Sequence, residues 1–236
     1  MPDHIVRSYD KDLEILDRKI AEMGGLAEKM LADSIDSLAS FDVDLARSVV
    51  ASDARLDLLQ REIEETAILT LARRQPLGID LREIVAAIRV SGDLERVGDL
   101  AKNISKRLIK IAGEIRLPRA VVGLKHMGEL AALQLKDVLD AYAQRDAERA
   151  KSVWLRDNEL DALDDSIFRE LLTYMMEDPR NISFCAHLLF CTKNIERVGD
   201  HATNIAETVH YLVTGDTLPV DRPRGPGGGF AAEGAA

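Results

Sequence analysis

The chain has 236 residues, 46% of them hydrophobic and only 4% aromatic, with a formal net charge of -10 and an isoelectric point near 5.1. The low aromatic content, together with abundant Leu, Ala and charged residues, indicates an all-α fold rather than a sandwich or barrel. The acidic charge argues against a nucleic-acid partner, and with neither an apolar run of about 18 residues nor a leader segment the sequence predicts a cytoplasmic protein.

Six long segments have the apolar spacing of helices, and none alternates like a strand. The first half is predicted to hold helices over residues 8–40, 42–74 and 80–113, with Ser8, then Asp42 or Asp44, then Asp80 as their N-caps. A Pro and a Gly interrupt the chain between the second and third helices. These three helices are expected to form one domain, residues 1–115.

The second half is predicted to hold three more helices, over residues 118–144, 146–176 and 182–214. An Asp-Pro pair ends the second of these. The second domain is therefore expected over residues 116–214. The remaining residues, 215–236, are rich in Gly and Pro, carry no periodicity, and are expected to be a disordered tail.

An eleven-residue phrase occurs twice in the chain. Leu94–Ile104 returns 101 residues later as Ile195–Ile205, with eight of the eleven positions identical. The pattern Asp53-x-x-x-Asp57, in the second predicted helix, likewise returns in the fifth, 104 residues later. A repeat of about 100 residues with three helices per copy indicates a duplicated three-helix bundle. We therefore expect two tandem, pseudo-symmetric three-helix bundles, each with its own core.

The repeated phrase places Glu95 and Asp99 four residues apart, so both carboxylates lie on one face of the third helix. That face borders the apolar stripe, and Asp53 and Asp57 lie at the margin of the corresponding stripe on the second helix. Four carboxylates converging from two helices resist ionisation unless a cation neutralises them. An all-oxygen ligand set suits Mg²⁺, Mn²⁺, Ca²⁺ or iron, and iron or manganese fits an intracellular helical bundle best.

Ion pairing is the alternative explanation for these carboxylates. Arg96 and Arg197 follow the Glu of each copy and could neutralise acidic groups across helices, with Asn103 and Asn204 bonding the backbone. His201 has no counterpart in the first copy, and we expect a satisfied or exposed histidine there rather than a ligand. The residues alone leave the metal site and the ion-pair network both open.

No motif for catalysis is recognisable in the sequence. The usual phosphate-cradling loops and the nucleophile elbow are missing. Glu207-x-x-His210 matches one element of di-iron bundles, but it occurs once and near a helix end. The sequence therefore predicts a protein that is not an enzyme. A carboxylate-bridged metal enzyme and a purely structural interaction protein are the competing interpretations.

Two copies of Glu-Arg-x-Gly-Asp-x-Ala-x-Asn-Ile, each preceded by an Asp-x-x-x-Asp helix, together make a specific pattern. With Tyr174–Pro179 before the last helix, this pattern resembles the PhoU family of bacterial phosphate-transport accessory and regulatory proteins. The resemblance covers residues 8–214 and implies two tandem three-helix bundles in a cytoplasmic homodimer. It also implies a negative regulator of phosphate uptake and of the phosphate-starvation two-component response.

In that role the protein would be an adaptor between two partners, the ATPase subunit of a high-affinity phosphate ABC transporter and a phosphate-sensing histidine kinase. It would meet the membrane only through them. The resemblance further implies that the acidic motifs hold a multinuclear iron cluster or another divalent metal such as manganese, magnesium or zinc. The implied ligands are Asp53, Asp57, Glu95 and Asp99 in the first half and Asp157, Asp161, Glu196 and Asp200 in the second.

Overall fold

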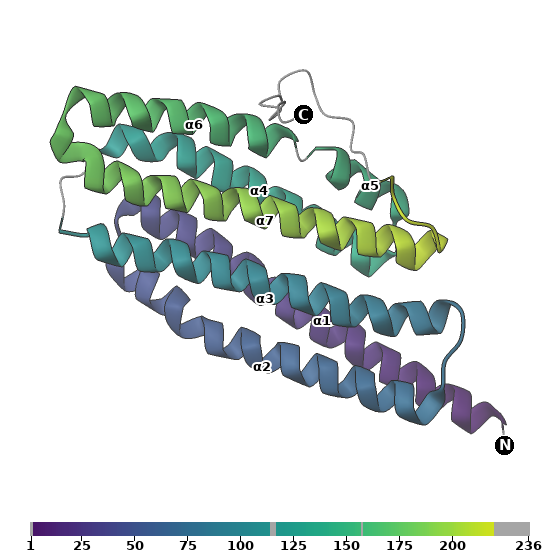
Figure 1. The fold of residues 1–236 in the computed structure, drawn as a ribbon. Coiled ribbons are helices and arrows are strands. Elements are labelled where there is room, and N and C mark those ends of the chain that lie inside the picture. Colours follow the sequence, from purple (N-terminus) through teal and green to yellow (C-terminus); the bar gives the residue numbers. More distant parts are fainter. Residues whose placement is uncertain (1, 114–116, 157, 220–236) are drawn as a thin grey trace, which may run out of the picture.

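The computed structural model describes residues 2–113, 117–156 and 158–219, with side chains from Lys11 onward, and these residues form an all-α protein, as predicted. Figure 1 shows the helices packed into an elongated bundle, with no strand in the described ranges. The elements are α1 (Pro2–Ser40), α2 (Val43–Arg74), α3 (Ile79–Ile111), α4 (Pro118–Gln144), α5 (Ala147–Leu155), α6 (Asn158–Glu177), the 3₁₀ turn η1 (Pro179–Asn181) and α7 (Ile182–Thr214).

Most predicted helix ends agree with the structure to within a few residues. Asp42 is the N-cap of α2, because its Oδ1 accepts hydrogen bonds from two backbone amides of the first turn at 3.0 Å. The first helix begins at Pro2 rather than near Ser8, since a proline suits the first helical position. Gly78 precedes α3, so Asp80 lies in the first turn of that helix instead of capping it.

The prediction of one continuous fifth helix is wrong, because the segment divides into α5 and α6. The Arg156 carbonyl accepts the Glu159 amide at 3.1 Å and the Gln134 side-chain amide at 3.3 Å, which gives a turn in place of the helical bond. The Arg156 guanidinium donates to Asp137 of α4 at 2.5 Å and holds this turn against that helix. The break therefore depends on contacts with α4.

The two halves of the chain lie against each other along α3 and α7, and α1 of the first half also packs on α4 of the second (Figure 1). Asp93 in the middle of α3 contacts Asn204 in the second half of α7, whereas Arg107 near the end of α3 contacts His187 near the start of α7. The central pair of helices is therefore antiparallel. This arrangement places the two copies of the repeated phrase side by side.

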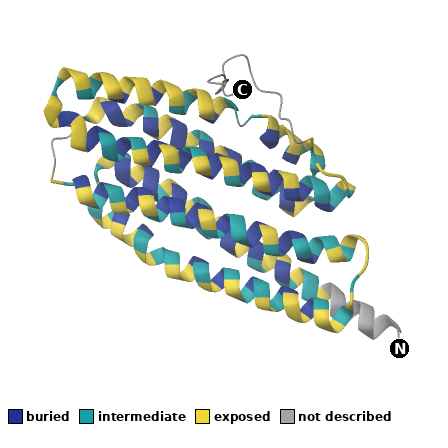
Figure 2. Cartoon of the chain, in the orientation of Figure 1, coloured by how far each residue is buried: buried dark blue, intermediate teal, exposed yellow. Residues whose placement is uncertain are grey.

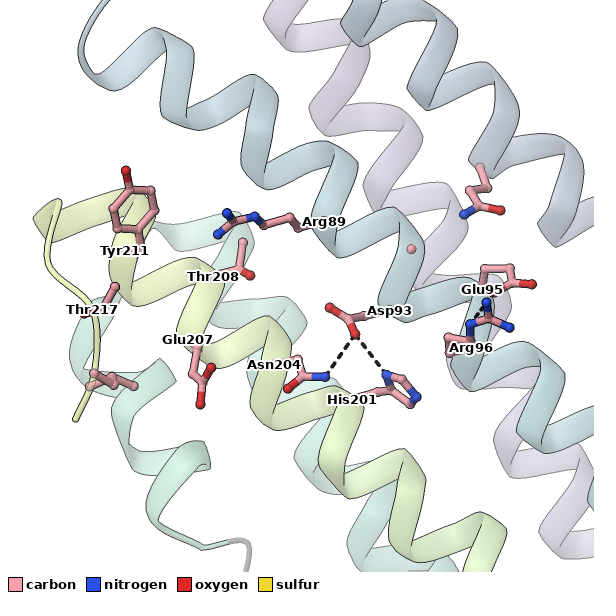
Figure 3. A pocket seen from close by; sticks show the side chains of 13 residues that line it. Arg89, Asp93, Glu95, Arg96, His201, Asn204, Glu207, Thr208, Tyr211 and Thr217 are labelled. Atoms are coloured by element: carbon pink, nitrogen blue, oxygen red, sulfur yellow. Dashed lines mark hydrogen bonds and ion pairs between the residues drawn. The ribbon is translucent and has the colours of Figure 1, made fainter. Parts of the chain in front are cut away.

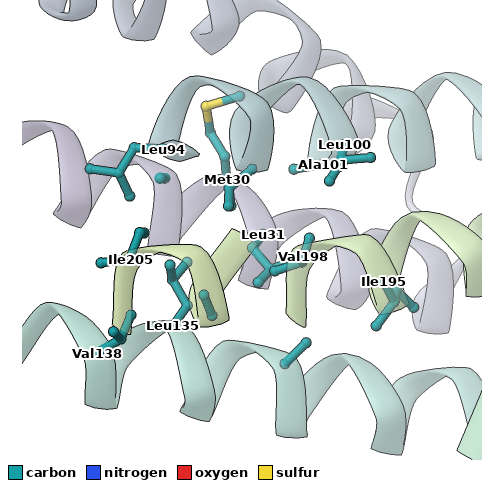
Figure 4. Packing of buried hydrophobic residues seen from close by; sticks show 14 of the residues in the cluster. Met30, Leu31, Leu94, Leu100, Ala101, Leu135, Val138, Ile195, Val198 and Ile205 are labelled. Atoms are coloured by element: carbon teal, nitrogen blue, oxygen red, sulfur yellow. The ribbon is translucent and has the colours of Figure 1, made fainter. Parts of the chain in front are cut away.

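The expectation that each bundle has its own core is wrong, because one hydrophobic cluster contains buried residues of both halves. Figure 4 shows Leu31 of α1, Leu135 of α4 and Val198 of α7 in the same interior. Figure 2 shows buried positions along the facing sides of the helices and exposed positions on their outer sides. The buried stripe of α7 is wide enough to face α3 and α4 together, so the halves share their interior.

The domain boundary between residues 115 and 116 stays a prediction, and it lies outside the described residues. Residues 220–236 of the predicted disordered tail are also outside them. Within the described ranges, no helix combines the length and the apolar content needed to cross a lipid bilayer.

Gly98, between Glu95 and Asp99 on α3, allows α2 and α3 to approach closely. The glycine is buried, and a Cβ atom placed on it would overlap Leu56 Cδ2 of α2. Any larger residue would push the two helices apart. The glycine therefore brings the acidic face of α3 against that of α2.

Candidate functional site

The first acidic set, Asp53 and Asp57 on α2 with Glu95 and Asp99 on α3, lies where these two helices pack together. A lysine stands between them: Lys102 Nζ donates to Asp53 Oδ2 at 2.6 Å and to Asp99 Oδ1 at 2.5 Å. Only 18% of the Lys102 side chain is exposed, against 15% for Asp53 and 30% for Asp99. The ammonium therefore bridges α2 and α3 in the position where a cation was expected.

The electrostatics of this set follow from partial burial. Burial disfavours the ionised form of Glu95 and raises its pKa; Asp99 and Asp57 add to the effect, whereas Arg96 opposes it. Burial also disfavours the charged form of Lys102, but its hydrogen bonds to the two aspartates outweigh this and raise its pKa to about 12. The lysine is therefore charged at neutral pH and neutralises part of the acidic set.

The first set in this form does not fit a metal ion. Arg96 adds a second cation, with its guanidinium 3.4 Å from Glu95 and 3.6 Å from Asp99. No group of three or more His, Cys, Asp or Glu side chains in the described part of the chain is arranged to hold a metal. Arg96 thus forms ion pairs, but with carboxylates of its own helix and not across helices as the alternative expected. The ion pair across helices comes from Lys102, the better-buried cation, which sequence reasoning missed.

The second acidic set is compensated differently. Glu196 Oε1 accepts a hydrogen bond from Lys193 Nζ at 2.5 Å, but the buried Glu196 Oε2 has no hydrogen-bond partner among the described atoms. Lys193 is 58% exposed, and Thr203 replaces the bridging Lys102 of the first copy. The predicted partner Arg197 forms no ion pair with a described residue. Glu196 is therefore neutralised by an exposed lysine, whereas Glu95 and Asp99 of the first set lie beside Arg96 and the better-buried Lys102.

The described members of the second set other than Glu196 are exposed. Asp161 and Asp200 are exposed, and Asp157 lies outside the described residues. Asp164 of α6, which sequence reasoning missed, is half-buried nearby: burial raises its pKa, Lys193 opposes this, and Glu196 and Asp161 add to it. The sequence could have identified Asp164 as a member of this set by its position three residues after Asp161, because residues three apart share a helix face.

A third polar group lies between the two halves, at a cavity of about 820 Å³ beside the α3–α7 crossing (Figure 3). Asp93 Oδ1 lies 2.9 Å from His201 Nδ1 and accepts from Asn204 Nδ2 at 3.3 Å. The expectation of a satisfied histidine is thus confirmed, whereas Asn204 bonds a carboxylate and not the backbone. The interactions link α3 to α7 across the two copies of the repeat.

Glu207 and His210, which matched part of a di-iron motif, are both engaged elsewhere. Glu207 Oε1 accepts a hydrogen bond from Trp154 Nε1 of α5 at 3.1 Å. His210 Nδ1 lies 3.1 Å from the backbone carbonyl of Asp216, beyond the end of α7. The pair therefore contributes to the packing at this end of the bundle.

Comparison with known proteins finds a matching family model and relatives that are similar over most of their length. The family model described as the PhoU domain matches residues 20–108 and again residues 124–209, one match in each half. The chain is 56% identical over 222 residues to the phosphate-specific transport system accessory protein PhoU homolog of Rhizobium meliloti (strain 1021), covering 94% of this chain and 93% of that protein.

Two crystal structures have the same fold. PhoU from Pseudomonas aeruginosa is 40% identical, with a TM-score of 0.84, over 88% of this chain and all of that one (100%). The phosphate transport system regulatory protein PhoU from Streptococcus pneumoniae is 27% identical, with a TM-score of 0.82, over 90% of this chain and 100% of that one. The resemblance inferred from the repeated motif is thereby confirmed.

Proposed function

This chain belongs to the PhoU family, and from that membership we propose that it is a regulatory accessory protein of a phosphate-specific transport system. The observation that carries the proposal is the likeness to the Rhizobium meliloti protein over nearly the full length of both chains. Nothing in the proposal requires catalysis by this chain, since its relatives are named accessory and regulatory proteins.

In its specific form the proposal is negative regulation. When phosphate is plentiful, the protein acts as a cytoplasmic adaptor that contacts two partners, the ATPase subunit of the transporter and a phosphate-sensing histidine kinase.

 Through these two contacts the adaptor restrains phosphate uptake and the phosphate-starvation response, and it has no catalytic role.

Exposed apolar side chains support an adaptor that docks on other proteins. Leu77, Ile79 and Leu81, where α2 passes into α3, are 83%, 52% and 38% exposed. On the outer side of α6, Phe168 and Met176 are 47% and 85% exposed. Groups of exposed apolar side chains are typical of protein interaction sites. We propose these two surfaces for partner binding and for the homodimer.

The proposed function is tested by measuring phosphate uptake and a phosphate-starvation reporter in cells grown on abundant phosphate. We expect cells that lack the protein to take up phosphate and express the reporter constitutively, and a plasmid copy of the chain to restore repression. Unchanged uptake and reporter expression in the deletion strain would contradict negative regulation.

Metal binding is a second part of the proposal, and it concerns the acidic set of the second half. The buried Glu196 Oε2, which has no hydrogen-bond partner among the described atoms, and the 58% exposure of the paired Lys193 favour a cation there. Glu196, Asp200 and Asp161 are not grouped for metal binding in the described structure. On binding, the exposed Asp161 and Asp200 would turn toward Glu196 and hold iron or another divalent ion such as manganese, magnesium or zinc. The metal would supply positive charge that joins α6 to α7. In the first set Lys102 already supplies that charge.

Metal content measured by plasma mass spectrometry distinguishes the two sets. We expect the double variant Glu196→Gln, Asp200→Asn to lose most of the metal that copurifies with the wild type. The matched variant Glu95→Gln, Asp99→Asn removes the same charge from the first half and is expected to keep it. Equal metal loss in both variants, or a wild type free of metal, would contradict the assignment.

A further inference from the structure

The central helix pair carries a second cavity, of about 480 Å³, at the opposite end from the one that contains Asp93. It lies between the last turns of α3 and the first half of α7. Its volume is within the range of small-molecule sites, about 300–1,000 Å³. The lining residues that matter here are Asn103, Lys106, Arg107 and Lys110 of α3 with Phe190 and Asn194 of α7.

This cavity is basic in a chain whose net charge is -10. Three of its lining residues are cations, and none of the described lining residues is acidic. Neither Lys106 nor Lys110 forms an ion pair with any described residue. Like charges four residues apart on a helix repel each other. The cavity therefore holds positive charge that the described part of the protein does not neutralise.

Arg107 is held in place at the wall of this cavity. Its guanidinium lies 4.1 Å from the centre of the Phe190 ring, and Nη1 is 3.3 Å from His187 Nδ1. Both contacts orient the planar group, and a guanidinium offers several N–H donors in a fork that matches a phosphate. The lysines on either side add mobile ammonium groups, and the two asparagines add amide donors from both helices.

The duplicated sequence supplies an internal comparison. At the offset of 101 residues, Asn103 corresponds to Asn204, but Lys106 corresponds to Glu207 and Lys110 to Tyr211. The cavity at the other end is lined by acidic as well as basic residues, and its Asp93 is paired with His201. The repeat therefore builds two related cavities, and only the one at Lys106 has an excess of cations.

We propose that the cavity at Lys106, Arg107 and Lys110 binds the phosphate group of a small molecule, either inorganic phosphate or a nucleotide. Three cations and two amides match the charge and the acceptor oxygens of a phosphate dianion. The inference deepens the proposed function, because it gives the regulator a ligand that reports on phosphate supply. It concerns binding to the purified chain, so it is tested apart from regulation in cells.

Isothermal titration calorimetry of the full chain with inorganic phosphate, and separately with AMP, tests the proposal. We expect one equivalent of at least one of these ligands to bind, with an affinity that falls as ionic strength rises. The variant Lys106→Gln, Lys110→Gln is expected to weaken binding about tenfold or more, because hydrogen bonds to charged groups are lost. Both lysines are exposed, so this variant is expected to fold.

The matched control is Lys125→Gln, Lys136→Gln, which removes the same charge from two exposed positions of α4. It is expected to bind as the wild type does. Binding of phosphate alone identifies the free ion as the ligand, and binding of AMP alone identifies a phosphomonoester; both outcomes support the proposal. No binding of either by the wild type, or equal weakening in both variants, would overturn it while leaving the regulatory function untouched.

Discussion

Replacing Leu31 by Ala is expected to lower the free energy of unfolding by about 3 kcal/mol, within the usual range for a fully buried leucine. The side chain of Leu31 is 0% exposed and belongs to the cluster shared by both halves (Figure 4). Because the core is continuous, we expect the variant to unfold in a single transition. The loss of stability should therefore be the same in the second half of the chain, which does not contain residue 31.

The single tryptophan allows the effect of Leu31→Ala on the second half to be measured in urea unfolding. Trp154 lies in α5, in the second half, so its fluorescence reports on that half while far-ultraviolet circular dichroism reports on all helices. We expect both signals to shift to lower urea by the same amount in Leu31→Ala. The control Leu133→Ala, at a position 48% exposed on α4, should cost less than about 1 kcal/mol. An unshifted Trp154 transition in Leu31→Ala would show two independent cores.

Replacing Lys102 by Met is expected to lower the free energy of unfolding at pH 7 by about 2 kcal/mol, less than a fully buried ion pair would cost because the site is partly exposed. The change keeps the apolar stem but leaves Asp53 and Asp99 facing each other without the ammonium. The control is Lys136→Met, since Lys136 is 60% exposed and, among the described residues, forms an ion pair only with Asp140. It should cost less than about 0.5 kcal/mol.

The pH dependence of this difference follows from the raised pKa of Lys102, about 12 against an ordinary 10.5. A raised pKa in the folded protein means that the contribution is complete below pH 10.5 and is lost as the pH rises through about 12. Chemical unfolding across this range measures it. A constant difference between the two proteins at all pH values would contradict the charge argument.

The helices and the family could be predicted from the sequence because both depend on patterns within short segments. Apolar spacing locates α2, α3, α4 and α7, and the cap at Asp42 is a contact within one turn. The two copies of the repeated phrase identified the PhoU family, since the residue types at each position are read directly.

The partners of the acidic residues could not be predicted, because they lie on other helices. Lys102 meets Asp53 from 49 positions away, and Asp93 meets His201 from 108 positions away. The same holds for the break between α5 and α6, which depends on Asp137 of α4. Helical periodicity states which side of a helix faces inward but not which neighbour it meets.

Sequence patterns were thus enough to establish an all-α, duplicated protein of the PhoU family with two acidic sets. Only the tertiary structure decided that the halves share one core, that Lys102 neutralises the first set, and that Glu196 of the second keeps a buried oxygen without a partner. The physical reason is that periodicity and motif spacing are properties of one segment. Burial, charge compensation and cavity shape arise when α3 packs against α2 and α7, and are properties of several segments at once.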